Sequence, residues 1–98
     1  MRHRARVDAN HAEVVKALRA VGALVHDTSR VGGGFPDIVV KFRGRVFLLE
    51  VKDGSKSKSR RQPTEAERKF LLLWWGPDGS VSVVESAEGA LRVVGALP

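Results

Sequence analysis

The fold is decided by the stretch from Gly32 to Lys52, which reads GGGFPDIVVKFRGRVFLLEVK. Two apolar runs flank the dipeptide Arg43-Gly44, and this pattern is typical of a β-hairpin. If the turn has two residues, counting back along both strands places Asp37 opposite Glu50. Their Cβ atoms would then lie about 5 Å apart.

Two carboxylates at that distance repel each other by roughly 3 kcal/mol at an effective dielectric near 20, and a divalent cation would offset this repulsion. Lys52 lies two residues beyond Glu50. Because alternate residues of a strand point to the same face, its ammonium should lie beside the carboxylates. The hairpin is therefore predicted to present two acids and an amine on one patch.

Length and composition limit what the chain can be. Its 98 residues, 43% of them hydrophobic, suit one small domain, 1–98, with a modest core. No run approaches the roughly 18 apolar residues that span a bilayer, so we expect a cytoplasmic protein with no membrane contact. The chain has no cysteine, which leaves oxygen and imidazole as metal ligands and favours Mg²⁺ or Mn²⁺.

The charge balance suits a polyanionic partner. Seventeen Lys and Arg against eleven Asp and Glu give a formal charge of +6 and a pI near 10.5, and DNA or RNA is the simplest partner. A protein that is basic for no binding reason fits the charge alone nearly as well. The placement of the cations favours nucleic acid, because they crowd the N-terminus and flank the acidic patch: Arg2, Arg4, Arg6, Lys52, Lys56, Lys58, Arg60 and Arg61.

Helices are predicted on both sides of the hairpin in the sequence. Apolar residues at helical spacing predict a first helix, with Asp8 or Asn10 as its N-cap and Gly22 at its C-terminal end. Thr64, followed by Glu67, has the pattern of a capping box and opens a second helix.

Shorter segments complete the chain. Residues 23–28 and 80–85 are predicted strands, and residues 86–94 are a predicted final helix capped by Ser86. Residues 53–63 offer no apolar side chain to a core and are predicted to be a mobile loop. The order is α-β-β-β-α-β-α. Because both faces of the hairpin are apolar, we expect a single α/β domain whose mixed central sheet is flanked by helices.

Three features follow one another along the chain: a predicted helix carrying Glu13, then Gly34-Phe35-Pro36-Asp37, then Glu50-Val51-Lys52. In these features and in their order the chain resembles the PD-(D/E)xK nuclease superfamily. Within it the chain looks like the VRR-NUC family, small stand-alone forms of which occur in phages and which is similar to archaeal Holliday junction resolvases. The resemblance covers about residues 8–94. It implies a restriction-endonuclease-like fold and a place in the cytoplasm of a bacterium or a phage-infected host cell.

The resemblance also implies roles for residues of the site. Asp37 and Glu50 would ligate Mg²⁺ or Mn²⁺, together with the backbone carbonyl of Val51. Lys52 would act on the attacking water or the scissile phosphate, and Glu13 would approach from the first helix. Elementary chemistry agrees for the hairpin residues, because a hard cation binds oxygens and acidifies a bound water. Glutamate early in a helix also suits the helix dipole, so a purely structural Glu13 remains an alternative.

One position departs from the family pattern. Many relatives carry Gln in the helix after the ExK triplet, and Glu67 stands at that place here, so Glu67 is not assigned a catalytic role. For DNA binding, phosphate contacts are expected from the loop after Lys52 and from the segment before the glycines: Lys56, Lys58, Arg60, Arg61, Ser29 and Arg30. A solvated linker is the alternative for the loop, and a turn with positive φ is the alternative for Gly32 to Gly34.

The residues and the resemblance together predict a divalent-metal-dependent, structure-specific DNA endonuclease that hydrolyses phosphodiester bonds without an organic cofactor. Branched DNA such as Holliday junctions is among its candidate substrates. Because a chain this small covers only one scissile phosphate, we expect a homodimer, with Trp75 or the first helix at its interface and one of Trp74 and Trp75 in the core. Two rivals stay open, a catalytically silent nucleic-acid-binding module and a basic protein that binds RNA or an acidic partner.

Overall fold

The computed structural model describes residues 9–98, apart from the side chains of Arg60 and Arg61. They form a small α/β domain around a four-stranded sheet of order β1-β2-β3-β4. The strands are β1 (Leu24–Asp27), β2 (Ile38–Phe42), β3 (Arg45–Val51) and β4 (Val81–Val84), and the helices are α1 (His11–Ala20), the 3-10 helix η1 (Lys58–Arg61), α2 (Glu65–Trp74) and α3 (Ala87–Val94). The predicted order of helices and strands is confirmed.

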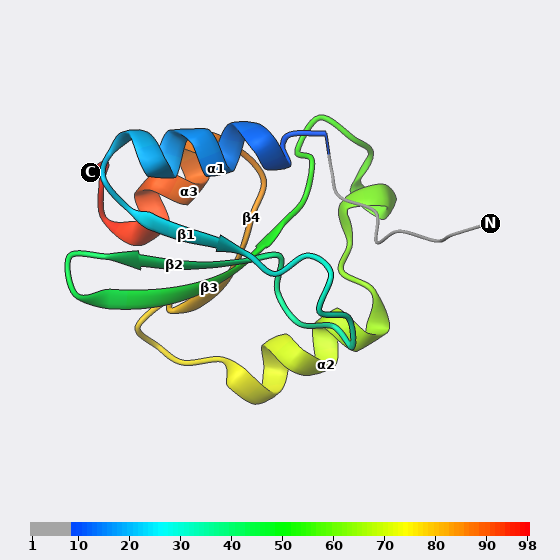
Figure 1. Ribbon diagram of the computed structural model, residues 1–98. Helices are drawn as coiled ribbons and strands as arrows, with labels where there is room; N and C mark the ends of the chain where they lie inside the picture. Colours follow the sequence, from blue (N-terminus) through cyan, green and yellow to red (C-terminus); the bar gives the residue numbers. More distant parts are fainter. Residues whose placement is uncertain (1–8) are drawn as a thin grey trace.

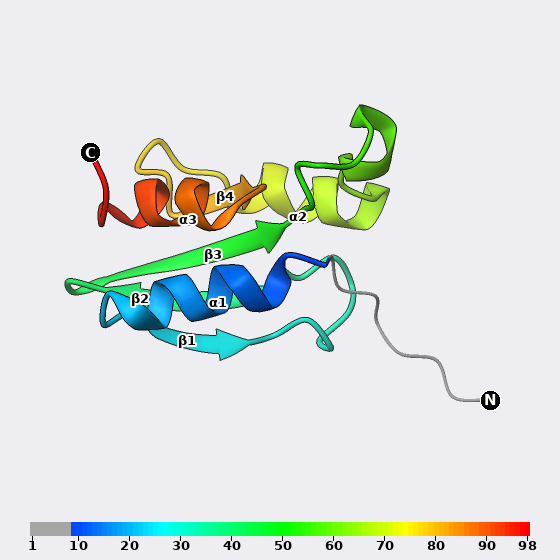
Figure 2. The ribbon, with the colours of Figure 1, turned by 90° about the horizontal axis from the view of Figure 1, so that it is seen from above.

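The sheet is mixed, as the sequence predicts. β1 and β3 run antiparallel to β2, and β4 runs parallel to β3. Helices α1 and α3 lie together on one face of the sheet and α2 lies on the other (Figure 1). Seen from above, α1 crosses the β1–β2 side of the sheet while α3 lies beside β4 (Figure 2). No helix formed by residues 9–98 has the length and apolarity that crossing a bilayer requires.

The hairpin has the two-residue turn that sets its register. Phe42 pairs with Arg45, and the ladder runs back to the pair of Ile38 and Leu49. Arg43 and Gly44 at the turn have φ angles of 52° and 81°, as a type I′ turn requires. The predicted register is therefore confirmed over the ladder, and continuing it by one residue places Asp37 opposite Glu50.

The core lies between the sheet and the pair α1 and α3. Alternate residues of the hairpin strands point toward these helices and are buried: Ile38, Val40, Phe42, Phe47, Leu49 and Val51. The helices contribute Val14, Leu18, Ala90 and Val94 to the same cluster. A fully buried leucine or valine stabilises a fold by about 1.5–3 kcal/mol, so this face of the sheet supplies most of the packing.

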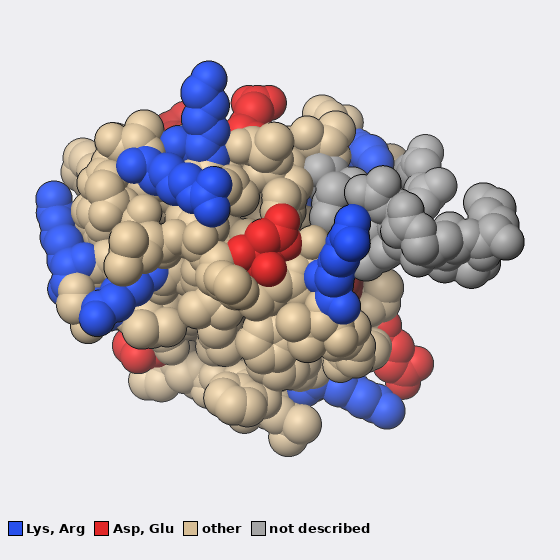
Figure 3. All heavy atoms as spheres, viewed as in Figure 1, with Lys and Arg blue, Asp and Glu red and all other residues tan. Residues whose placement is uncertain are grey.

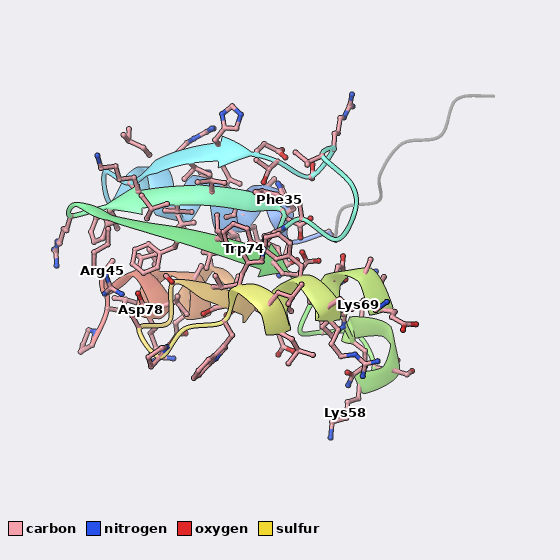
Figure 4. All side chains as sticks on the ribbon, turned by 90° about the horizontal axis from the view of Figure 1, so that it is seen from below. Phe35, Arg45, Lys58, Lys69, Trp74 and Asp78 are labelled. Carbon is pink, nitrogen blue, oxygen red and sulfur yellow. The ribbon has the colours of Figure 1, made fainter. Side chains whose placement is uncertain are left out.

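The opposite face of the sheet is covered only in part. Helix α2 contacts the sheet near β4, and it contains no fully buried residue. Along the rest of this face, Leu24 and Val46 are 68% and 52% exposed. Figure 4 shows this face from below, with α2 crossing it at one side and β1 and β2 left open beyond it. The prediction of helices on both faces is confirmed for their placement, but the coverage is unequal.

Helix caps hold α2 and α3 as predicted. Thr64 Oγ1 accepts the N–H of Glu67 at 3.2 Å, and Glu67 Oε1 accepts the N–H of Thr64 at 2.7 Å. Ser86 Oγ accepts the N–H of Gly89 at 3.0 Å. These bonds satisfy amide groups that a helix start otherwise leaves unpaired.

The prediction that the side chain of Asn10 could cap the first helix is wrong. Asn10 stands at the N-cap position of α1, but its side chain makes no capping hydrogen bond. Its Nδ2 donates instead to the carbonyls of Lys52, at 3.0 Å, and Glu85, at 2.9 Å. Asn10 therefore ties the start of α1 to the ends of β3 and β4, while the alternative cap, Asp8, lies outside the described residues.

Two further expectations change. The segment 53–63 is not wholly irregular, since it contains η1, and a 3-10 turn needs only local hydrogen bonds. The prediction that Trp74 or Trp75 lies in the core is wrong, because they are 58% and 67% exposed. Trp74 stacks on Phe70 with ring centroids 5.2 Å apart. Both tryptophans are exposed because α2 contacts the sheet only near β4, and its C-terminal end has no element packed over it among the described residues.

Candidate active site

Asp37 and Glu50 meet where β2 begins and β3 ends. Asp37 Oδ2 accepts the N–H of Val51 at 2.8 Å, and the Asp37 carbonyl accepts the N–H of Thr28 at 2.8 Å. The carbonyl of Pro36 accepts Thr28 Oγ1 at 2.7 Å. The carboxylate of Asp37 therefore continues the hydrogen bonding of the ladder at the point where the backbone pairing stops.

Pro36 leaves a carbonyl without a ladder donor. In the continued register Pro36 lies opposite Val51, and a proline has no N–H to donate. The carbonyl of Val51, which the family resemblance names as a ligand, therefore receives no such bond from the opposite strand. Val51 itself is buried at the end of β3, next to the two carboxylates.

Glu50 is the most unusual group of the site. Its side chain is 3% exposed, Oε2 lies 3.4 Å from Lys52 Nζ, and the buried Oε1 has no hydrogen-bond partner among the described residues. Burial, then hydrogen bonding to Glu67 and the negative charge of Asp37, raise the pKa of Glu50 to about 9. In the chain without a bound cation the carboxyl is therefore protonated at pH 7.

Lys52 and Glu67 form an ion pair beside Glu50. Lys52 Nζ donates to Glu67 Oε1 at 3.0 Å. Burial alone would lower the pKa of Lys52, but the hydrogen bond to Glu67 and the charges of Glu67 and Glu50 raise it. Burial would likewise raise the pKa of Glu67, but hydrogen bonds from Glu50, the Thr64 N–H and Lys52 lower it. Lys52 therefore stays an ammonium and Glu67 a carboxylate.

Sequence reasoning did not place Glu67 in the site. Two features of the sequence distinguish Glu67: its position in the capping box and its alignment with the Gln of the resembled family. Neither feature gives the orientation of α2 relative to β3, on which the 3.0 Å contact with Lys52 depends.

The first helix brings His11, and not Glu13, toward the acids. His11 is buried, and its Nε2 lies 3.3 Å from Asp27 Oδ2. Burial raises the pKa of Asp37, and the Val51 hydrogen bond and the electrostatic effect of His11 oppose this rise. Glu13 is exposed and has no contact with Asp37 or Glu50 in the part of the chain that is described. Two residues along a helix are about 200° apart around its axis, so His11 and Glu13 face opposite ways.

Gly34 explains why the loop before Pro36 lies close to α2. Its φ is +83°, and a Cβ at this position would overlap the carbonyl of Ala66 and lie 2.9 Å from the nitrogen of Glu67. All three glycines of the run have positive φ, so the turn interpretation of this run is confirmed. Gly34 is required in addition by its contact with the first turn of α2.

The predicted DNA-binding residues do not form one cluster. Ser29 donates from both N and Oγ to Asp27 Oδ1, at 2.9 and 2.6 Å, so its hydroxyl is bound within its own turn. Arg30 and Lys58 are exposed, and Lys56 is half-buried. Figure 4 shows Lys58 pointing outward beyond the start of α2. On the face that Figure 3 shows, Lys and Arg side chains are dispersed and do not form a single patch.

Other residues predicted to contact DNA lie outside the part of the chain that the structure describes. The side chains of Arg60 and Arg61, and the residues Arg2, Arg4 and Arg6, lie outside what the structure describes. Their expected phosphate contacts stay predictions.

The residues of the site fit a hard divalent ion. Asp37 has a second carboxylate oxygen beyond the one that Val51 uses, Glu50 has the unpartnered Oε1, and the carbonyl of Val51 faces a proline. Mg²⁺ commonly uses one or two carboxylates and keeps several waters. Residues 9–98 contain no group of three or more His, Asp or Glu side chains arranged to hold a metal, so the proposed donors are two carboxylates and a carbonyl.

Comparison of the chain with models of known protein families, with curated proteins and with solved structures found no match. The relationship to the VRR-NUC family therefore stays a prediction that depends on the motif residues and on the order of the helices and strands.

Proposed function

We propose that the chain is a divalent-metal-dependent DNA endonuclease that hydrolyses phosphodiester bonds and prefers a particular DNA structure. The observation that carries the proposal is Glu50, a carboxyl group that is 2% exposed and has one oxygen without a partner. Burying such a group costs free energy, and an apolar side chain would pack there without that cost. A role in holding a cation beside Asp37 accounts for a carboxyl at this position.

Each side chain of the site has a task in this reaction. A bound Mg²⁺ or Mn²⁺ would supply an acidified water and offset charge on the phosphate. Asp37 and Glu50 would hold the ion, and the N–H of Val51 fixes the orientation of Asp37 through the 2.8 Å bond to Oδ2. The ammonium of Lys52 would contact the attacking water or an oxygen of the scissile phosphate, where negative charge increases during the reaction.

The charge of the chain supports DNA as the partner. The formal charge of +6 attracts a polyanion. Protein binding releases counterions from DNA, and this release gains less entropy as the salt concentration rises, so affinity should fall with added salt. Lys56 and Lys58 lie four and six residues after Lys52, in the segment that leads from the site through η1 to α2. A DNA strand whose phosphate reaches Lys52 would therefore pass this segment.

The first test compares labelled four-way junctions, flaps, nicked duplexes and linear duplexes in Mg²⁺, Mn²⁺ or EDTA. We expect cleavage with either metal, none with EDTA, and faster cleavage of at least one branched substrate than of the linear duplex. The protein is checked for folding by circular dichroism in each buffer. Absence of cleavage of every substrate in both metals, or full activity in EDTA, would contradict the proposal.

We also propose that two copies of the chain pair through α2. Leu72 and Leu73 are 74% and 84% exposed on this helix, next to the exposed Trp74 and Trp75. Several large apolar side chains exposed at one end of a helix often mark an interaction site. Two copies would also supply two active sites, one for each strand of a duplex or junction.

The expected result is a dimer in light scattering that Leu73→Lys converts to monomer. The fold should survive, because Leu73 contributes almost nothing to the monomer core. Leu97→Lys, at a residue that is 37% exposed near the C-terminus, is the matched control and should remain dimeric. A wild-type chain that is strictly monomeric with and without DNA removes the dimer.

A further inference from the structure

We propose that Glu67 is the positioning residue of Lys52. This inference rests on the nuclease proposal. Glu67 lies outside the Asp37, Glu50 and Lys52 motif, and it stands where many members of the resembled family carry Gln, so the resemblance gives it no role. Glu67 is not proposed to touch the substrate. It acts by holding the ammonium that does.

The contacts of one oxygen carry the inference. Glu67 Oε1 accepts from Lys52 Nζ at 3.0 Å and from the N–H of Thr64 at 2.7 Å. The second bond belongs to the capping box, so it fixes the carboxylate on the backbone of α2. The first bond then fixes the end of the Lys52 side chain, whose Nζ lies 3.4 Å from Glu50 Oε2.

Lysine needs such a partner more than most side chains do. Its ammonium stands on a flexible four-carbon chain and carries three donors that can point in many directions. The Lys52 side chain is 12% exposed, so water cannot hold it as it would at the surface. With Glu67 in place, the ammonium has two acceptors on the protein and one remaining donor for a water or a phosphate oxygen.

The position of Glu67 is itself held by contacts between α2 and the loop before Pro36. The backbone of Gly34 lies so close to Ala66 and Glu67 that a Cβ would not fit. Three residues after Glu67, the ring of Phe70 contacts that of Phe35 edge-on, with centroids 5.2 Å apart. The loop that leads to Pro36 and Asp37 and the helix that carries Glu67 are therefore packed as one unit, which places Lys52 relative to Asp37.

The test separates the positioning role from the capping role. Glu67→Ala removes the acceptor for both Lys52 and Thr64, whereas Glu67→Gln keeps an oxygen that can accept both bonds. Thr64→Ala is the control, because it weakens the same helix cap through Thr64 Oγ1 and leaves the carboxylate of Glu67 beside Lys52.

We expect Glu67→Ala to lower kcat on the best DNA substrate by roughly 10- to 100-fold, with KM and the half-saturating Mg²⁺ concentration within about twofold of wild type. Glu67→Gln should recover most of the lost kcat. Thr64→Ala should lower the melting temperature about as much as Glu67→Ala does and leave kcat within about twofold. Equal losses of kcat in Glu67→Ala and Thr64→Ala would overturn the proposal, because that pattern follows from a weakened helix alone.

A second readout does not depend on cleavage. Acetic anhydride in limiting amounts is expected to label Lys52 slowly in the wild type and several-fold faster in Glu67→Ala, as measured by mass spectrometry against the exposed Lys69. Thr64→Ala should leave the Lys52 labelling rate unchanged. If no variant or wild type cleaves DNA but this pattern holds, the nuclease proposal fails while the contact stands; if Glu67→Ala leaves the labelling unchanged, the positioning role is wrong.

Discussion

Asp37→Asn is expected to reduce the rate of DNA cleavage by roughly 1000-fold or more, about 4 kcal/mol of transition-state stabilisation, and to leave the fold intact. Asparagine keeps an oxygen that can accept the N–H of Val51, which Asp37 Oδ2 accepts at 2.8 Å. The substitution therefore removes the charge that would hold the cation and preserves the hydrogen bond that holds the loop. Asp37→Ala should lose the same activity and also some stability, because it leaves a buried N–H without an acceptor.

Single-turnover cleavage and thermal unfolding measure the two effects separately. Asp78→Asn is the matched control, since Asp78 Oδ1 also accepts a backbone N–H, from Ser80 at 3.1 Å, and lies outside the site. It should cleave at the wild-type rate. A folded Asp37→Asn variant with near-normal activity would remove Asp37 from the chemistry.

The same variant separates the nuclease from its rivals. A basic protein that binds RNA or an acidic partner through residues 55–61 would lose binding when this segment is shortened and would tolerate Asp37→Asn. A catalytically silent DNA-binding module would tolerate Asp37→Asn and show no cleavage at all. The nuclease proposal predicts that Asp37→Asn abolishes cleavage while DNA binding in EDTA, measured by fluorescence anisotropy, changes little.

Glu50→Gln is expected to abolish cleavage and, in the absence of metal, to stabilise the fold. Glutamine keeps the shape and, like a protonated carboxyl, has a donor that could serve Glu67. It cannot supply the negative charge that a cation needs. Two opposite effects from one substitution are expected only if the carboxyl is retained for function at a cost to stability.

The pH dependence of this effect follows from the pKa of Glu50, which is raised from 4.5 to about 9 in the folded protein. Between these two pH values the unfolded chain has lost a proton that the folded chain keeps. The free energy of unfolding that Glu50 contributes is fully present below pH 4.5 and falls as the pH rises toward 9. Glutamine does not titrate, so the variant lacks this fall and should be more stable at pH 7 by roughly 1–3 kcal/mol.

Thermal unfolding in EDTA at pH 5, 7 and 8.5 checks the prediction. The difference in melting temperature between Glu50→Gln and wild type should grow across this series. Glu88→Gln is the matched control, because Glu88 pairs with Arg92 at an exposed site and should show no such trend. Adding Mg²⁺ should raise the melting temperature of the wild type and not of Glu50→Gln. A variant that is less stable than wild type at every pH would contradict the pKa argument.

Much of the site was accessible to reasoning from the amino acids alone. The hairpin, its two-residue turn and the pairing of Asp37 with Glu50 depend on a period of two and on turn chemistry within fewer than twenty residues. The capping box of α2, the Ser86 cap of α3 and the order of helices and strands are local in the same sense. Such features follow from the backbone geometry of residues close together in the sequence, so the amino-acid sequence alone is enough to predict them.

Other features could be decided only when the helices were packed on the sheet. Glu67 reaches Lys52 across 15 residues, and Asn10 reaches the carbonyl of Glu85 across 75. The orientation of α1 about its axis buries His11 and exposes Glu13. Because α2 contacts only a small part of the sheet, near β4, Trp75 stays exposed. These outcomes depend on the orientation that each helix adopts when apolar surfaces far apart in the chain pack together. Local periodicity shows which face of a helix is apolar, but only the packed structure shows which polar groups lie at the edge of that contact.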